Sequence, residues 1–148
     1  MISADTNVFA YLYDEDSPGK QAVARIAVAA LANRQGIVGL QVVGELNNVL
    51  RRKMRKTPAE AAQAGRRLIG GFPVFPPTRQ AAIWALEQAA AATLQYWDAL
   101  LLASARHAGV DTILTEDLSD GAEINGILII NPFSEQGLSS RARQVLEI

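Results

Sequence analysis

The chain has 148 residues, with 14 Lys and Arg against 15 Asp and Glu, a single histidine and no cysteine. The lack of cysteine excludes disulfides, thiolate zinc sites, iron–sulfur clusters and a cysteine nucleophile. The lone histidine, His107, excludes His-rich metal cages and catalysis by a pair of histidines. Any chemistry must therefore rest on carboxylates, hydroxyls and amides.

The composition is that of an ordinary globular fold, with 49% apolar and 20% charged residues. This length suits one domain, which we expect to span residues 1–148. No basic segment followed by an apolar run opens the chain, and no apolar run approaches the ~18 residues that a spanning helix needs. We therefore expect a cytoplasmic protein without a membrane segment.

Short apolar runs rich in Ile and Val alternate with longer helical patterns along the chain. The apolar runs predict strands at Ile2–Ala4, Ile37–Leu40, Val74–Phe75, Thr112–Leu114 and Ile127–Ile130. The helical patterns predict helices at about 18–33, 41–55, 58–70, 79–94 and 96–108. This alternation favours an α/β fold with a central, mostly parallel sheet of about five short strands. Residues 134–148 fit either a short additional helix or a flexible tail.

Several helix ends carry local signals. Thr57 and Glu60 have the spacing of a capping box, and Thr78 is placed to cap the next helix. His107 and Gly109 are typical of a helix carboxyl end, with the glycine in the left-handed conformation and the histidine near the last carbonyls. We therefore expect His107 to have a capping role and no part in catalysis.

Four acidic residues are predicted to meet at one edge of the sheet. Asp5 follows the first strand, and Glu45 lies about one turn into the helix after the second. Asp98 begins the helix that leads into the strand 112–114, and Asp117 follows that strand. In right-handed βαβ units, helix amino ends and strand carboxyl ends share an edge, which is also where such sheets bind ligands.

Clustered carboxylates repel one another unless a cation compensates their charge. Mg²⁺ or Mn²⁺ suits such a site because these hard ions prefer oxygen ligands and retain several waters. A water activated by the metal can attack a phosphodiester without His, Cys or Ser. Taken singly, each acid is better explained as a helix cap or an exposed charge, so the prediction depends on all four converging.

Neighbouring residues have predicted supporting roles. Asn7 either caps the first helix or orients a metal-bound water or phosphate, and Thr115 is placed to hydrogen-bond Asp5. Glu116 and Asp117 are adjacent and should point in different directions, so only one of them is expected to face the metal. The sequence leaves open which of the two is the fourth acid.

Charge is unevenly distributed along the chain. Residues 50–67 contain seven Lys or Arg and one Glu, whereas residues 111–135 contain six acids and no basic residue. The basic stretch is either a solvated helical surface or a rim that holds phosphates. In the second interpretation the phosphate-binding side chains are Arg51, Arg52, Lys53 and Arg55.

The chain resembles the PIN-domain family and, within it, the VapC-type toxins of type II toxin–antitoxin pairs. The resemblance is carried by the ordered segments Asp5-Thr6-Asn7-Val8-Phe9, Gly44-Glu45-Leu46, Tyr96-Trp97-Asp98-Ala99-Leu100, Thr115-Glu116-Asp117-Leu118, Gly126-Ile127 and Asn131-Pro132-Phe133. It implies a three-layer α/β/α sandwich and an acidic quartet formed by Asp5, Glu45, Asp98 and Asp117. It further implies that Asp5 and Asp98 are the most direct metal ligands.

The same resemblance implies cleavage of RNA that depends on Mg²⁺ or Mn²⁺. It also implies a homodimer and a small cognate antitoxin, VapB-like, whose tail occupies the acidic groove. Two other functions stay open from the residues alone. A non-catalytic module would use the acids to bind nucleic acid or a basic peptide, whereas an aspartyl-phosphate phosphatase would need a second acid where the chain has Asn7.

Overall fold

Eight short strands and seven α-helices make up the computed structural model, which describes residues 1–148. The helices are α1 (Thr6–Ala10), α2 (Pro18–Asn33), α3 (Leu40–Arg52), α4 (Pro58–Gly71), α5 (Arg79–Ala90), α6 (Tyr96–His107) and α7 (Ser140–Leu146), with a 3₁₀ turn η1 (Tyr11–Tyr13) after α1. The strands are β1 (Ile2–Ala4), β2 (Val38–Gly39), β3 (Val74–Phe75), β4 (Thr112–Leu114), β5 (Glu123–Ile124), β6 (Ile127–Ile130), β7 (Phe133–Ser134) and β8 (Gly137–Leu138).

The central sheet is mostly parallel, as the sequence predicts. Strands β1, β4 and β6 pair in parallel, and β5 adds an antiparallel edge. Strands β2 and β3 form a second parallel pair, which the Ile37 N–H joins to β1 by donating to the Ile2 carbonyl at 3.1 Å. The spatial order is thus β3-β2-β1-β4-β6-β5, in which the five predicted strands are the parallel ones.

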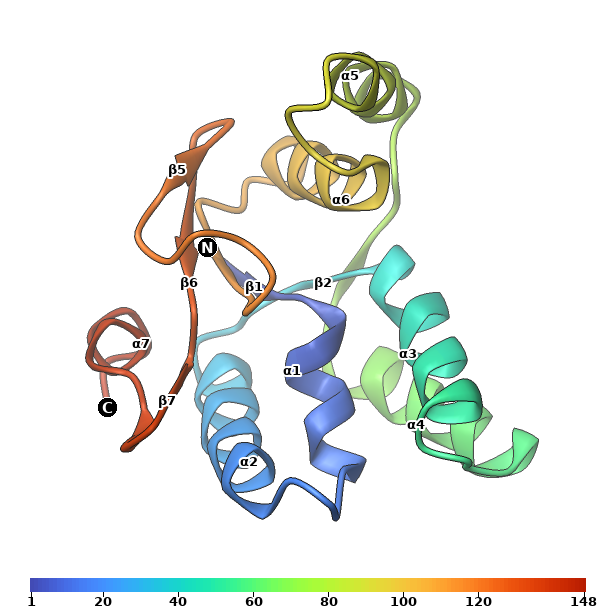
Figure 1. Ribbon diagram of the computed structural model, residues 1–148, viewed down its shortest axis with the longest axis vertical. Coiled ribbons are helices and arrows are strands. Elements are labelled where there is room, and N and C mark those ends of the chain that lie inside the picture. The colour runs from blue at the N-terminus through green and yellow to red at the C-terminus, as the bar shows by residue number, and fades with distance from the viewer.

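Helices cover both faces of the sheet, which gives three layers (Figure 1). Helices α5 and α6 lie on one face, and α1 to α4 with α7 lie on the other (Figure 1). Strands β1 and β4 are buried along their whole length, and their apolar side chains belong to a main core of 30 buried residues. A smaller cluster of five buried residues holds α5 against α6. Burial on both faces explains why these strands are uniformly apolar.

The predicted helix ends are partly confirmed. Thr57 and Glu60 form the capping box, and the Thr78 hydroxyl accepts a hydrogen bond from the Ala81 N–H. Gly109 has a φ of +85°, as expected after a helix end. His107 is the last residue of α6, where Nδ1 lies 2.9 Å from the Thr78 hydroxyl, so this ring links α6 to the start of α5.

Two predicted helices are shorter than expected. The helix expected at 41–55 ends at Arg52, because the Arg51 guanidinium donates to the Lys56 carbonyl and Arg55 takes a positive φ. The helix expected at 79–94 ends at Ala90, where Ala92 has a positive φ and a turn follows. The second strand is also shorter than the predicted 37–40.

Residues 134–148 form a hairpin and a helix, so the interpretation as a flexible tail is wrong. Strands β7 and β8 pair in antiparallel fashion, and the Ser139 hydroxyl caps α7 by accepting from the Ala142 N–H. Ala142 and Leu146 are buried in the main core, which fixes α7 against the body. None of the helices combines the length and apolar character that crossing a membrane requires.

Candidate metal centre

Asp5 lies at the junction of β1 and α1 and is buried, with 7% of its surface exposed. It is the N-cap of α1: Oδ1 accepts from the Thr6 N–H at 2.6 Å. Oδ2 accepts from the buried Thr115 hydroxyl at 3.1 Å, which is the hydrogen bond expected from the sequence. Burial raises the pKa of Asp5 from its ordinary 3.8 to about 6, and the charges of Glu45 and Asp117 add to this rise.

Glu45 is held from two directions. The Thr6 hydroxyl donates to Oε2 at 2.8 Å, and the Gln41 amide donates to Oε1 at 2.6 Å from one turn earlier on α3. The same Gln41 amide also donates to the Trp97 carbonyl at 2.9 Å. Gln41 therefore connects α3 to the first turn of α6, where Asp98 lies.

Asp98 sits in the first turn of α6, and its backbone N–H donates to the side chain of Gln95, the N-cap. Burial raises the pKa of Asp98, followed by the charges of Asp117 and Glu45. A carboxylate in the first turn of a helix is favoured by the helix dipole, and no side-chain cation within ion-pair distance compensates it here.

Asp117 follows β4 and belongs to the same group of acids. Its Oδ2 accepts from the Asn7 amide at 2.8 Å, and its N–H donates to the Thr115 hydroxyl at 3.2 Å. Burial and the neighbouring charge of Glu116 raise the pKa of Asp117, whereas the charge of Lys53 opposes this rise.

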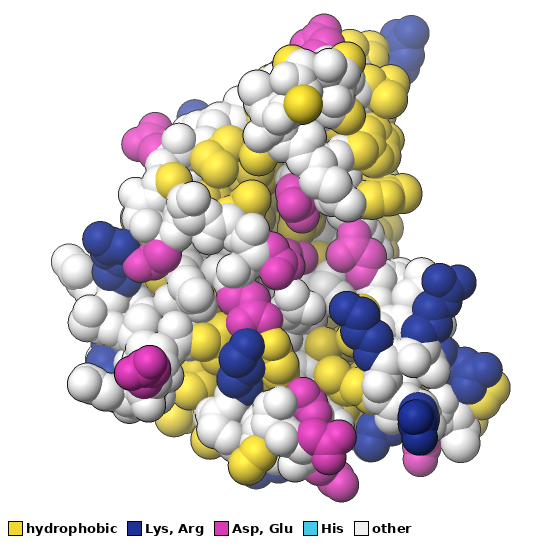
Figure 2. Space-filling view, viewed as in Figure 1, with side chains coloured by type: hydrophobic (Ala, Val, Ile, Leu, Met, Phe, Trp, Pro, Cys, Tyr) yellow, Lys and Arg dark blue, Asp and Glu magenta, His cyan; other side chains and the backbone are white.

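All four acids line one cavity of about 750 Å³, together with Asn7, Gln41 and Trp97. They come from four separate segments of the chain. Figure 2 shows acidic side chains gathered at the centre of this face, between the α5–α6 unit and the lower helices. Trp97 lies at the rim with 53% of its surface exposed.

Glu116 faces away from this cavity. Its carboxylate is bound by the Lys20 ammonium at 2.6 Å and by the Tyr11 hydroxyl at 2.5 Å. Of the two adjacent acids, only Asp117 lines the cavity with the other three. The strand ends at Leu114 and residues 116–118 form a bend, so their different orientations follow from the contacts that each side chain makes.

The four carboxylates fit a divalent cation by the kind of donor they offer. They supply only oxygen ligands. Asp5 is buried, Asp98 is half-buried and Asp117 is exposed, and the pKa of each is raised first by partial loss of contact with water and then by neighbouring negative charges. As the side chains stand, no three of them converge closely enough to hold one ion. At most two would bind an ion directly, which is the usual protein share for Mg²⁺.

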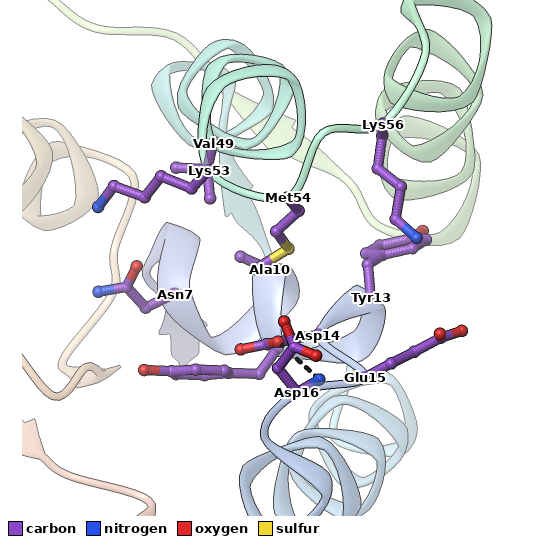
Figure 3. A pocket seen from close by; sticks show the side chains of 11 residues that line it. Asn7, Ala10, Tyr13, Asp14, Glu15, Asp16, Val49, Lys53, Met54 and Lys56 are labelled. Carbon is purple, nitrogen blue, oxygen red and sulfur yellow. Dashed lines mark hydrogen bonds between the residues drawn. The ribbon is translucent and has the colours of Figure 1, made fainter.

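A second cavity of about 430 Å³ adjoins the first and shares Asn7 and Val49 with it. In Figure 3, Lys53 and Asn7 extend along one side of this cavity, and Asp14, Glu15 and Asp16 border the other. Among the predicted phosphate-binding residues, Lys53 is the one that lines this cavity. Arg51 is engaged in the α3–α4 turn, and Arg52 and Arg55 are exposed.

Four residues that contact the acids were not predicted in these roles: Thr6, Gln41, Tyr11 and Lys20. The role of Gln41 could have been found from its spacing, because positions i and i+4 share a helix face and Glu45 is four residues later. The contacts of Tyr11 and Lys20 with Glu116 join residues about 100 positions apart and have no local signal.

The model of the family described as PIN domain matches residues 2–119. No curated protein matches the sequence significantly. The structure is similar to that of VapC20 of Mycobacterium tuberculosis, a toxin that cleaves the sarcin–ricin loop, with a TM-score of 0.61 and 21% identity over 79% of this chain and 92% of that one.

Two further solved structures have the same fold. A toxin–antitoxin complex from Klebsiella pneumoniae aligns with a TM-score of 0.62 and 18% identity, over 90% of this chain and 98% of that one. VapBC2 from Rickettsia felis, bound to a DNA fragment of its promoter, aligns with a TM-score of 0.60 and 13% identity, over 87% and 97% of the two chains. At such identities the likeness shows a shared fold.

Proposed function

The chain belongs to the PIN domain family, and from that premise we propose that it is a divalent-metal-dependent endoribonuclease that acts as the toxin of a toxin–antitoxin pair. One observation carries the proposal. Four carboxylates from separate segments line a single cavity, and no side-chain cation forms an ion pair with any of them. Such a cluster is most stable with a divalent ion among its oxygens.

In this proposal Asp5 and Asp98 hold the ion directly, and Glu45 and Asp117 complete the centre through water. When bound, Mg²⁺ or Mn²⁺ would lower the pKa of a water and neutralise charge on the scissile phosphate. Direct binding of the ion by only two carboxylates is supported by their arrangement, because no three of them lie close enough together to hold one ion.

The remaining residues of the site orient the four acids. The Thr115 hydroxyl donates to Asp5, so that carboxylate has one defined direction. The Thr6 hydroxyl and the Gln41 amide hold both oxygens of Glu45. Hydrogen bonds of this kind prevent the acids from turning away from one another and so keep a ready set of oxygen ligands.

Lys53 supports RNA as the substrate. It lines the adjoining cavity, and its charge acts on Asp117. A lysine beside the acids offers a phosphate-binding group next to the reacting centre. The exposed Arg52 and Arg55 extend positive charge along the α3–α4 surface, and with Lys53 and Arg51 they form the proposed RNA-binding rim.

The decisive experiment compares RNA cleavage by the unmodified protein and by Asp5→Asn, with Mg²⁺ or Mn²⁺ and after treatment with EDTA. We expect products with 5′-phosphate and 3′-hydroxyl ends, and loss of cleavage with EDTA or in the variant. Glu87→Gln is a matched control, since it removes one exposed carboxylate on α5, away from the cavity. Equal cleavage by the protein and by Asp5→Asn would rule out the mechanism.

The alternative is a non-catalytic module in which the acids receive a nucleic acid or a basic peptide. Its signature is distinct: no cleavage with any divalent ion, and partner binding that persists in Asp5→Asn. The burial of Asp5 favours the metal enzyme: burial raises the pKa of this carboxyl, and a surface that only binds a peptide has no need of a buried acid.

We infer that the partners are a small antitoxin of the VapB kind and a second copy of the chain. An antitoxin is supported by the fold shared with toxin–antitoxin complexes and by the acidic cavity, which suits a basic segment. Self-association is supported by Ile83 and Leu86, large apolar side chains exposed on α5. Light scattering during size exclusion, repeated with Leu86→Lys, tests the homodimer.

A further inference from the structure

Lys20 is outside the carboxylate cavity, yet it contacts the residue beside one of the four acids. We propose that Lys20 and Tyr11 are positioning residues that hold Glu116 out of the metal centre, so that Asp117 is the only acid the segment after β4 presents there. This inference rests on the proposed function and adds to it a specific arrangement that selects the fourth acid.

The contacts of Glu116 are complete without the metal centre. The Lys20 ammonium binds Oε2 at 2.6 Å, and the Tyr11 hydroxyl donates to Oε1 at 2.5 Å. Lys20 also donates to the Tyr11 hydroxyl at 2.8 Å, which closes a three-membered network. Only 18% of the Glu116 side chain is exposed, whereas 42% of the Lys20 side chain is, so the carboxylate is the shielded part of the network.

Aromatic rings fix the position of the ammonium group. Lys20 Nζ lies 4.6 Å from the centre of the Tyr11 ring and 5.5 Å from that of Phe133. The two rings meet edge to face with centres 5.0 Å apart. The Lys20 ammonium is therefore held by cation–π attraction to the two rings and by its ion pair with Glu116.

The network joins parts of the fold that surround the centre. Tyr11 is in η1, Lys20 is in α2, Glu116 follows β4 and Phe133 begins β7. Glu116 and Asp117 are adjacent in the bend after β4, so anchoring the Glu116 side chain also restrains the backbone from which Asp117 extends. The Asp117 carboxylate is held separately, because the Asn7 amide donates a hydrogen bond to its Oδ2 at 2.8 Å.

Without Lys20, Glu116 would keep only the hydrogen bond from the Tyr11 hydroxyl and would lose the positive charge that balances it. Its negative charge already raises the pKa of Asp117, and the charge of Lys20 opposes that effect. A released Glu116 would be drawn to a cation in the centre and would compete with Asp117 for it. The expected result is an ion that is held more tightly and placed less well for cleavage.

Lys20→Met tests this inference because it keeps the apolar stem and removes the charge. We expect kcat for RNA cleavage to fall about 10-fold or more with little change in KM, as for loss of other residues that orient metal ligands. We expect Mn²⁺, measured by titration calorimetry without RNA, to bind about fivefold more tightly. Partial unfolding of the variant would lower both kcat and Mn²⁺ affinity. A lower kcat together with a higher Mn²⁺ affinity therefore distinguishes a positioning role from unfolding.

The double variant Lys20→Met/Glu116→Gln removes the competing charge and should return both kcat and Mn²⁺ affinity close to the starting values. Lys20→Arg keeps the ion pair and should preserve both. Arg25→Met, on the exposed side of the same helix, is the matched control for loss of one positive charge.

A double variant as slow as Lys20→Met would overturn the inference, as would an unchanged kcat in Lys20→Met. A rise in KM alone would assign Lys20 to RNA phosphates instead. The Mn²⁺ titrations need no cleavage, so they test the role of Lys20 even if the unmodified protein cleaves no RNA, which would refute the proposed function separately.

Discussion

Asn7 donates a hydrogen bond from Nδ2 to Oδ2 of Asp117 over 2.8 Å, across 110 residues of sequence. Asn7 belongs to the first turn of α1 and Asp117 to the segment after β4, so this bond connects the two neighbouring strand ends of the central sheet. The hydrogen bond to Oδ2 fixes the orientation of the Asp117 carboxylate, so Oδ1 keeps one direction. A metal ligand requires such a fixed orientation.

Asn7→Ala should therefore lower metal affinity or RNA cleavage about 10- to 100-fold, the usual effect of removing a group that orients a metal ligand. The fold should persist because Asn7 is only half-buried. Cleavage rate and Mn²⁺ affinity are the measurements, with Asn33→Ala, exposed at the end of α2, as the control. An unchanged rate and affinity would mean that the Asn7–Asp117 bond has no part in the centre.

Asp5 should make the stability of the metal-free protein depend on pH. Its pKa is raised from 3.8 to about 6, so the folded state holds the proton more tightly than the unfolded chain does. Ionisation therefore destabilises the fold, an effect that is absent below about pH 3.8 and complete above about pH 6. Asp5→Asn lacks this charge at every pH.

The free energy of unfolding of Asp5→Asn, minus that of the unmodified protein, should therefore rise by about 2–3 kcal/mol between pH 4 and pH 7. Urea unfolding in EDTA at each pH gives this difference, and the subtraction removes contributions from the other titrating groups. A difference that does not vary with pH would contradict the burial of an ionisable carboxyl at this position.

Divalent ions should stabilise the fold at pH 7, because binding to the folded state alone adds about 2.7 kcal/mol at a concentration 100-fold above Kd. For a chain of this length that corresponds to a rise in Tm of about 5–10 °C. The rise, measured by calorimetry with Mn²⁺, should reverse with EDTA and be absent in Asp98→Asn. Equal shifts in the variant and the unmodified protein would place the ion elsewhere.

Lys53 should affect RNA binding and leave the chemical step largely intact. Lys53→Gln removes one cation beside the carboxylates, so KM should rise. The slope of log K for single-stranded RNA against log salt concentration should also become shallower by about 0.7. Binding titrations at several salt concentrations measure this slope. Arg67→Gln on α4, which does not line either of the two cavities described, should leave it unchanged.

The sequence was sufficient to predict the parallel core of this fold. The strands at Ile2–Ala4, Val74–Phe75, Thr112–Leu114 and Ile127–Ile130 have the predicted bounds, because short apolar runs rich in Ile and Val have few alternatives once both faces are covered. The capping box of Thr57 and Glu60 was equally visible, since it depends only on neighbours in the chain.

The strand β5 and the β7–β8 hairpin were not predicted. Each of these strands has two residues, too few for any period to show. Their pairing depends on the turn at Asn125 and Gly126, both with positive φ, and on the turn at residues 135–136. The helix α7 was one of two alternatives for its segment, and its burial against the main core decided between them.

For the site, the sequence by itself determined which residues come to the carboxyl edge of the sheet, because chain direction and the hand of βαβ units settle where each acid lies. Only the tertiary structure decided where their side chains point. Glu116 and Asp117 are neighbours of similar chemistry, and the choice between them depends on Lys20, Tyr11 and Asn7. Those partners are about 100 residues away, and contacts at that range follow from packing rather than from any local pattern.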